Sequence, residues 1–468
     1  MRPCNVLSRL ASLLVAAAVA LPSSTAATSS SLHELHNLVR RASAGSGAPN
    51  ASLVDTARMG LLSSQRASWE QGTAQSALLE YDAGSWSVFA GGHGNGPPYR
   101  PGFQPSKTPD GVPLAVLSMA YHSATAQDGM GKLGMSITGD ENMTDGSALD
   151  SASCGEGVLL AAFVAKQINA TRGFWINAAQ DQLDYVLNEA PRTEAGAISH
   201  RTRTVALWSD AVYMMPPFLA AYGLYTNNQS LLQTAYDQIR LYRQAMRFPD
   251  GPGEGLWGHI LAYSANGTAR WLDGQAWTTG EGWVAAGMLR TLASIAQSPY
   301  STQMASQKAD LVAWTKEILD ASFPLLDSSS SLFHNYMNDT TTFRDTAGST
   351  FLAYAAYRLA SMSPSDDTHL AAAEKIYQAT QGQLTRIGSY LTPVVNALDF
   401  GAQGSTSPEA LSFTMLLEAA RRDYHAGNVT GVDGPGTGRN GAMPGIKGGV
   451  AAPVLVAAVT ATLLLLLS

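Results

Sequence analysis

The chain has 468 residues, of which 45% are hydrophobic and 14% are charged, so it has ample apolar surface for a large core. Lys and Arg total 29 against 36 Asp and Glu, which gives a formal net charge of −7. This balance excludes a basic phosphate-tracking surface, and we expect no nucleic-acid partner. Length alone permits about two or three domains, so the domain number must come from the internal pattern of the chain.

The first 27 residues predict a secretory signal peptide. Two arginines precede an apolar run, Leu10–Leu21, and small residues follow as far as Ala27. The run is too short to span a bilayer, and such a segment is removed from the mature protein. Removal would leave Cys154 as the only thiol, so the fold must be held by its core rather than by disulfides.

Seven N-x-S/T triplets agree with a secretory route, because their asparagines can accept N-linked glycans. One triplet is a weak signal, since triplets arise by chance. Their number, together with the predicted signal peptide, favours a glycosylated extracellular protein. The candidate glycosylation sites are Asn50, Asn142, Asn169, Asn228, Asn266, Asn338 and Asn428.

The C-terminus has a pattern typical of a lipid-anchor signal. A glycine-rich linker spans residues 427–448, and a hydrophobic segment, 449–468, ends the chain with no charged residue after it. We predict a glycosylphosphatidylinositol anchor at Asn440, with Gly436 and Gly438 as alternative attachment sites, and therefore a place on the cell surface. A tail-anchored membrane span is the rival interpretation.

Between residues 50 and 426 one pattern occurs six times. A polar or glycine-containing start leads into a run of small and apolar residues with few charges, and a new start follows about every 60 to 80 residues. Such runs suit helices that are buried on all sides. The six starts are Trp69, Asp150, Asp210, Trp277, Asp345 and Ser407.

Amphipathic segments alternate with these runs. Residues 230–247, 307–322 and 368–386 place apolar side chains at three- and four-residue spacing, with charges on the opposite face. A ring of six buried helices inside a ring of amphipathic ones is an all-α (α/α)6 barrel. We predict one such domain over residues 50–426 and expect a monomer; strand signals are sparse, and residues 386–395 give the best one.

If the inner helices run in the same direction, their N-terminal starts line one mouth, where an Asp most often caps the backbone amides. Asp210 differs, because the Pro216–Pro217 pair places its helix start five or six residues further on. This isolated carboxylate beside Trp208 and Tyr213 is a candidate general acid, with a pKa raised by its apolar neighbours. A structural Asp bound to a backbone amide is the alternative.

Three segments together resemble the unsaturated rhamnogalacturonyl hydrolases of glycoside hydrolase family 105 and the related unsaturated glucuronyl hydrolases of family 88. The segments are LWSDAVYMMPPFLAAYGLYT from Leu207, GEGLWGHI ending at Ile260 and AWTTGEGWVAAGMLRTLASI from Ala276. Their order and spacing, together with the six-hairpin repeat, match over nearly all of the mature chain. The resemblance implies a glycoside hydrolase with an oligosaccharide substrate.

The resemblance also implies roles for individual residues. Asp210 would be the catalytic acid/base, and Asp150 a second catalytic carboxyl whose negative charge keeps the pKa of Asp210 high. No Cys/His cluster is present, and we predict neither a metal nor another cofactor. Substrate contacts are expected from Trp208, Tyr213, His259, Trp277, Thr279 and Trp283.

The chemistry of this class explains why one carboxyl can suffice. Its substrates carry a C4=C5 double bond in the non-reducing uronic residue, which makes that sugar a vinyl ether. Protonation of C4 gives an oxocarbenium ion at C5, water adds there, and the resulting hemiketal opens and expels the aglycone. One group can give the first proton and then take one from the water.

One departure from the family pattern concerns the W-x-R-G-N-G-W segment of bacterial members. This chain has Thr279 in place of the Arg and Glu281 in place of the Asn. Because arginine is a natural partner for carboxylates, the substrate subsite is open to question. Arg201, Arg203 and His200 are candidate substitutes.

Two alternative functions follow from these patterns. Another (α/α)6 cell-wall glycosidase or transglycosidase, such as a mannanase, typically has two adjacent aspartates at one inner-helix start. The Asp366–Asp367 pair of this chain precedes an amphipathic outer segment instead. A non-catalytic carbohydrate-binding barrel is the second alternative, and the missing arginine at position 279 favours it.

Overall fold

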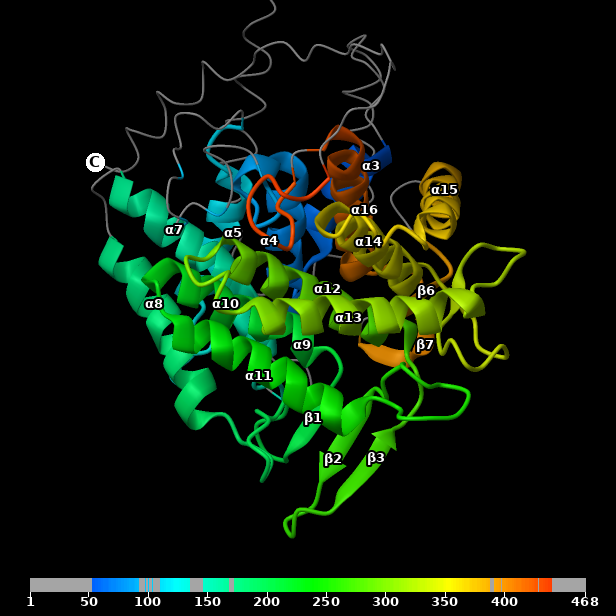
Figure 1. Ribbon diagram of the computed structural model, residues 1–468, viewed down its shortest axis with the longest axis horizontal. Helices are drawn as coiled ribbons and strands as arrows, with labels where there is room; N and C mark the ends of the chain where they lie inside the picture. The colour runs from blue at the N-terminus through cyan, green and yellow to red at the C-terminus, as the bar shows by residue number, and fades with distance from the viewer. Residues whose placement is uncertain are drawn as a thin grey trace, which may run out of the picture.

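The computed structural model describes residues 53–91, 97, 100, 103, 110–134, 146–167, 172–387, 391–396, 398–427 and 429–439. Over these residues the chain is mostly helical, and short strands gather at one side (Figure 1). The predicted signal peptide and the hydrophobic C-terminal segment lie outside the described residues. Within the described part, no helix is long and apolar enough to cross a membrane.

The inner ring consists of helices that begin where the sequence repeat predicts. Each helix packs against the next in chain order, and the last packs against the first, which closes the ring. Two of them are buried along their whole length, as their runs of small and apolar residues require. The inner helices are α4 (Ser68–Asp82), α7 (Gly155–Gln167), α10 (Pro216–Thr226), α12 (Thr278–Gln297), α14 (Thr346–Met362) and α16 (Pro408–Ala426).

The outer ring alternates with the inner one along the chain. Each outer helix packs on a neighbouring inner helix, and α11 and α13 lie on the outside in Figure 1. The predicted amphipathic segments correspond to α11, α13 and α15, and the (α/α)6 barrel is confirmed. The outer helices are α3 (Leu53–Ser64), α5 (Leu114–Thr125), α8 (Arg172–Asp184), α11 (Gln229–Met246), α13 (Ala305–Ser322) and α15 (Leu370–Ile387).

Short antiparallel strands lie just before several inner helices, so they mark the end of the barrel at which these helices begin. One strand precedes each of α9 (Ala211–Met214), α12, α14 and α16. The predicted strand signal at residues 386–395 overlaps β6. The sheets are β1 (Ala206–Trp208) with β2 (Ile260–Tyr263) and β3 (Ala269–Asp273), β4 (Phe333–His334) with β5 (Arg344–Asp345), and β6 (Val394–Asn396) with β7 (Asp399–Gly404).

Carboxylates cap two of the inner helices, as expected for acidic residues at helix starts. Asp345 accepts hydrogen bonds from the N–H groups of Ala347 and Gly348 at 3.1 and 2.9 Å at the start of α14. Glu70, in the first turn of α4, accepts from the N–H of Ala67 at 3.0 Å. These carboxylates satisfy backbone donors that the helices leave unpaired.

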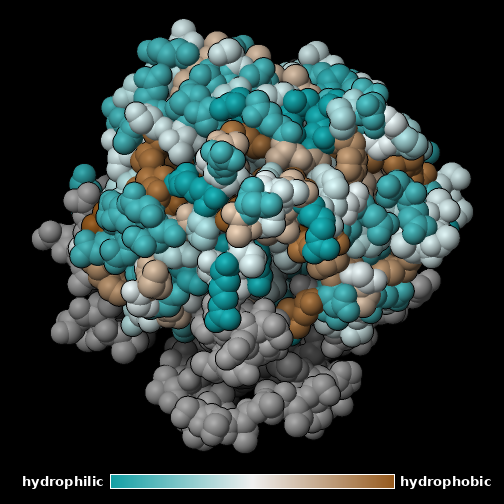
Figure 2. Space-filling view, turned by 90° about the horizontal axis from the view of Figure 1, so that it is seen from below, coloured by the Kyte–Doolittle hydropathy of each residue, from teal (hydrophilic) through white to brown (hydrophobic). Residues whose placement is uncertain are grey.

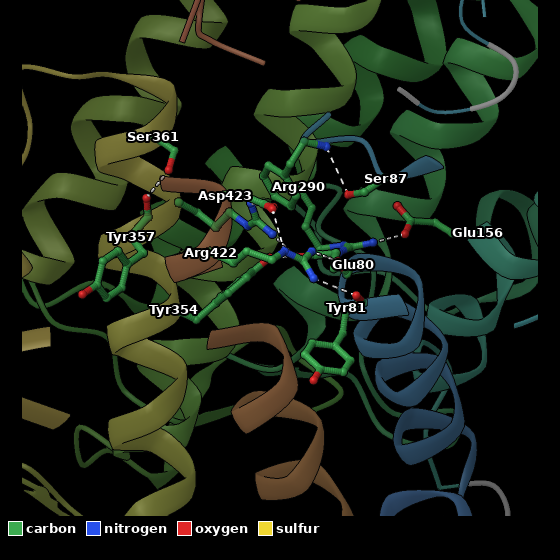
Figure 3. A network of polar contacts seen from close by, with 12 residues as sticks. Glu80, Tyr81, Ser87, Glu156, Arg290, Tyr354, Tyr357, Ser361, Arg422 and Asp423 are labelled. Atoms are coloured by element: carbon green, nitrogen blue, oxygen red, sulfur yellow. Dashed lines mark hydrogen bonds and ion pairs between the residues drawn. The ribbon is translucent and has the colours of Figure 1, made fainter. Parts of the chain in front are cut away.

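A buried network of charges joins five inner helices (Figure 3). Glu80 of α4 accepts hydrogen bonds from Arg290 of α12 at 2.5 Å and from Arg358 of α14 at 2.7 Å. Arg290 also binds Glu156 of α7, and Arg358 binds Asp423 of α16 at 2.7 Å. Each buried charge thus has an opposite partner, without which burial would cost several kcal/mol.

The residues after α16 are fixed to the barrel, although the sequence predicted a linker from residue 427. Thr430 is buried; its N–H donates to the carbonyl of Phe89 at 2.8 Å, and its Oγ1 accepts from Gln297 at 2.7 Å. The N–H of Arg439 donates to the carbonyl of Ser361 at 2.8 Å. The partners lie at or just beyond the C-terminal ends of α4, α12 and α14. This C-terminal strap, residues 429–439, therefore crosses the barrel end opposite the strands.

Candidate active site

Asp210 lies in the turn between β1 and the short helix α9, at the mouth of the barrel. Asp210 is the N-cap residue of α9, a helix that the sequence did not predict, but its side chain caps no backbone amide there; α10 begins at Pro216, as predicted. Its Oδ2 accepts a hydrogen bond from Ser209 Oγ at 3.2 Å and lies 3.4 Å from His259 Nε2. The 3.4 Å contact is long for a hydrogen bond but well within the range of an ion pair.

His259 lies between two carboxylates. It directly precedes β2, and its buried ring places Nδ1 3.0 Å from Asp273 Oδ2, opposite the contact with Asp210. Burial alone would lower the pKa of His259, but the hydrogen bonds and charges of Asp210 and Asp273 outweigh burial and raise it. The imidazolium form, with both ring nitrogens protonated, is therefore favoured.

The pKa of Asp210 is lowered, which corrects the prediction that it is raised. Burial acts to raise it, but the close contact and charge of His259 and the charge of His200 outweigh burial. The sequence showed the apolar neighbours of Asp210 but not the histidine that the β2 segment brings to it. Asp210 and His259 consequently form a pair that shares one proton.

Asp150 supplies a second carboxyl to the same site. It begins the 3₁₀ turn η3 (Asp150–Cys154) before α7, and its Oδ1 lies 3.5 Å from His200 Nε2. Burial raises the pKa of Asp150 against the lowering effect of His200, and the nearby charge of Asp210 raises it further. Burial also lowers the pKa of His200. Two carboxyls of one site are thus shifted in opposite directions, as in many acid/base sites.

Aromatic side chains enclose the two histidines. Trp208 stacks on His200 with 5.0 Å between ring centroids, and the ring of Trp277 lies 4.4 Å from that of His259. Phe400 of β7 lies 4.5 Å from His259. The structure thus brings Trp208, Trp277 and His259 together around Asp210. Phe400 was missed, because no local pattern connects that strand with a site built some 190 residues earlier in the chain.

Three predicted substrate contacts lie in the core instead. Tyr213 and Trp283 pack together with 4.8 Å between ring centroids, and Trp283 packs on Phe413 of α16. Thr279 is fully buried, and its Oγ1 donates to Asp345 Oδ2 at 2.7 Å. The geometry gives these side chains packing and capping roles rather than the predicted contact with substrate.

A third carboxyl at the mouth of the barrel, that of Glu409, was not among the predicted site residues. Glu409 lies in the first turn of α16, and its Oε1 accepts a hydrogen bond from Trp69 Nε1 at 2.5 Å. Burial, with the charges of Glu70 and Asp210, raises its pKa well above the usual range. The signal was present, since Glu409 stands two residues after the sixth predicted start, Ser407.

Of the three candidate substitutes for the missing arginine, Arg201 is the one that the structure places against Trp208. Its guanidinium carbon lies 5.6 Å from the ring centroid of Trp208, and no described carboxylate forms an ion pair with it. Gly146 makes room for it, because a Cβ there would lie 1.8 Å from Nη2. His200 is instead occupied with Asp150, and Arg203 is exposed.

Other predicted positions are distributed as follows. Asn228, Asn266 and Asn338 are exposed, whereas the remaining four predicted glycosylation sites and Asn440 lie outside the described residues. No group of His, Cys, Asp and Glu side chains within the described ranges is arranged to hold a metal ion. The side of the molecule that Figure 2 presents is mainly hydrophilic, with small hydrophobic patches.

Solved structures of several glycosidases share this fold. A possible member of family GH105 from Salmonella enterica has a TM-score of 0.59 and 15% identity, covering 86% of this chain and 97% of that one. A possible member of the same family from Klebsiella pneumoniae has a TM-score of 0.58 and 14% identity, covering 80% and 92%. A family 88 glycosyl hydrolase from Bacteroides vulgatus has a TM-score of 0.53 and 13% identity, covering 77% and 93%. These identities establish likeness of fold.

The family follows from the sequence itself. Residues 119–396, more than half of the chain, match the profile of Glycosyl Hydrolase Family 88. A search of curated proteins found no match. The chain belongs to Glycosyl Hydrolase Family 88, and it is a glycoside hydrolase of the class that acts on unsaturated uronyl oligosaccharides.

Proposed function

We propose that this enzyme hydrolyses rhamnogalacturonyl or glucuronyl oligosaccharides by hydrating the C4=C5 vinyl ether, with Asp210 as the acid/base. One observation carries the proposal: Asp210 and Asp150 stand at neighbouring helix starts, and each is in contact with a histidine. The tryptophan rings beside these histidines supply an apolar wall against which a sugar ring can stack.

The proton inventory of the pair fits this chemistry. Asp210 gives a proton to C4, and the C5 oxocarbenium ion is attacked by water. Asp210 then takes a proton from that water, so the pair ends with the number of protons with which it began. The C5 hemiketal opens, and the bond to the aglycone breaks. His259 resupplies Asp210 before the first step, since one proton is shared between them.

Asp150 has a different role in this proposal. Its raised pKa keeps it protonated to a higher pH than an ordinary carboxyl, so it can donate a hydrogen bond. We assign it to a substrate hydroxyl or to the attacking water. This replaces the expectation that a negative Asp150 acts by raising the pKa of Asp210.

The uronate carboxylate of the substrate needs a cationic partner. Thr279 cannot provide one, and its hydroxyl is engaged with Asp345. Arg201 has a guanidinium held on Trp208 beside the site; its charge acts on Asp150, but no described carboxylate lies within ion-pair distance of it. We therefore assign carboxylate binding to Arg201.

An absorbance assay tests the proposal. Purified enzyme is incubated with lyase-generated unsaturated disaccharides, and loss of the ultraviolet absorbance of the double bond is followed. Asp210→Asn should lower kcat at least about 100-fold, the scale of general acid/base catalysis. The matched control is Asp367→Asn in the exposed turn before α15, which should leave the rate unchanged. No absorbance loss with rhamnogalacturonan-, glucuronan- or xylan-derived substrates would refute the assignment.

Secretion and surface attachment are a separate part of the proposal. The N-terminal apolar segment, the sequons and the C-terminal hydrophobic segment support a glycosylated protein that is attached by a lipid near Asn440. Phosphatidylinositol-specific phospholipase C should release the enzyme from intact cells. Retention after that treatment, with release by detergent alone, would favour the tail-anchored span.

A further inference from the structure

Asp273, at the end of β3, lies on the side of His259 opposite Asp210. Its Oδ2 accepts a hydrogen bond from Tyr336 Oη at 2.6 Å and lies 3.0 Å from His259 Nδ1. Its Oδ1 accepts from the N–H of Gln275 at 3.1 Å. The side chain is 9% exposed. The carboxylate is therefore fixed from three sides without any contribution from substrate.

His259 is also held in position by its own backbone and by neighbouring aromatic rings. Its carbonyl accepts from the N–H of Ser209, the residue before Asp210, at 3.0 Å. Its ring is enclosed by Trp277 and Phe400. With one carboxylate on each ring nitrogen, both nitrogens must act as donors for both contacts to be favourable.

We propose that Asp273, oriented by Tyr336, is a positioning residue that holds His259 with both ring nitrogens protonated and so keeps a proton available to Asp210. This inference rests on the proposed function. His259 Nε2 gives its proton to Asp210, Asp210 passes that proton to C4, and the proton that Asp210 then takes from the added water returns to His259 Nε2 by the reverse path. Asp273 itself exchanges no proton with the substrate.

The charges around His259 determine how the pair titrates. Burial raises the pKa of Asp273, but its hydrogen bonds from His259 and Tyr336 outweigh burial, so it is ionised at neutral pH. Its charge keeps the proton on the Asp210–His259 pair as the pH rises. The titratable and charged groups that face the pair from the surrounding elements are Asp150 of η3, His200 and Arg201 before β1, Asp273 of β3, Tyr336 after β4, Asp399 of β7 and Glu409 of α16.

The decisive measurement is the pH profile of kcat/KM. Asp273→Asn removes the negative charge, so the pair should lose its proton at lower pH. The alkaline limb should move toward acid by about one to three pH units, the scale for an opposite charge at contact distance. Asp273→Glu keeps the charge, so its limb should stay near that of the wild type even if the rate falls. Asp367→Asn removes an exposed charge in the turn before α15, outside the site, and its profile should be unchanged.

Two results would overturn the inference. One is an Asp273→Asn enzyme whose rate falls equally at all pH values, which is what a purely structural role produces. The other is an Asp273→Asn enzyme identical to the wild type. Wild-type enzyme that removes no double bond from any substrate contradicts the proposed function instead, so the two failures are distinguishable.

A second readout needs no turnover. The ¹⁵N chemical shifts of the His259 ring in the wild-type enzyme should show both nitrogens protonated at neutral pH. In Asp273→Asn the same titration should move to lower pH. A neutral single-tautomer ring in the wild type at neutral pH would contradict the proposal, whatever the activity.

Discussion

Replacing Glu80 by Gln should test how far the buried charge network holds the barrel together. Glu80 lies at the centre of this network (Figure 3). It accepts hydrogen bonds from Arg290, Arg358 and Tyr354, and its side chain is 1% exposed. Glutamine has nearly the same volume and keeps one acceptor oxygen. It removes the negative charge, however, and turns an N–H₂ group toward two guanidinium groups that have no acceptor to offer.

The expected loss is about 3 kcal/mol in the free energy of unfolding, the lower end of the range for breaking a buried ion pair. That is roughly a 100-fold change in the folding equilibrium, since about 1.4 kcal/mol is tenfold. The loss is also a large part of the total free energy of unfolding, which is about 5–15 kcal/mol for most proteins.

Urea unfolding followed by circular dichroism measures this loss. The matched control is Glu374→Gln on α15, where the carboxylate pairs with Arg421 at 2.8 Å but is 36% exposed. That change should cost about 1 kcal/mol or less, because water solvates both partners. Molar salt should weaken the control pair and leave the Glu80 contacts nearly unaffected. Equal losses in the two variants would refute the reasoning.

Three further substitutions have defined outcomes. Glu281 accepts from the N–H of Trp257 at 2.7 Å, and burial raises its pKa well above the usual range. Its protonation therefore stabilises the fold fully below the unfolded pKa of about 4.3, and this stabilisation is lost as the pH rises toward the folded pKa. Glu281→Gln keeps the acceptor without titrating, so its stability relative to wild type should increase between about pH 5 and 8 in thermal melts; a constant difference would contradict this. Thr279→Val should cost about 1 kcal/mol in urea unfolding through the lost bond to Asp345, and no measurable loss would argue against that bond. Gly146→Ala should push the Arg201 guanidinium aside and raise KM about tenfold at similar kcat, whereas an unchanged KM would remove Arg201 from substrate binding.

The fold was predictable because a short stretch of sequence indicates where each inner helix begins and that it is buried. The runs of small and apolar residues after Trp277 and Asp345 carry few charges and suit burial inside a ring, and α12 and α14 are buried throughout. The Pro216–Pro217 pair located the start of α10, but it gave no sign of the short helix α9, which begins directly after Asp210. Local chain stiffness and hydrophobicity were sufficient for these inferences.

The ionisation of the site was not predictable, because it depends on contacts between distant segments. Trp208 and Tyr213 suggested a raised pKa for Asp210, whereas His259, brought in through strand β2, reverses the direction. Asp273 stands only fourteen residues after His259, yet its effect depends on a hairpin register that the sequence does not state. Spacing along the chain locates candidate groups, but proton affinities depend on their packing.

Under the proposed lipid attachment, the C-terminal strap would determine which way the enzyme faces. It leaves the barrel at the end where α12 and α14 finish, and an inner helix of 17 to 20 residues separates that end from Asp210. At 1.5 Å per residue, this is a separation of roughly 25–30 Å. A tether continuing from Arg439 would hold the catalytic opening toward the medium, within reach of long polysaccharide fragments that diffuse past the cell.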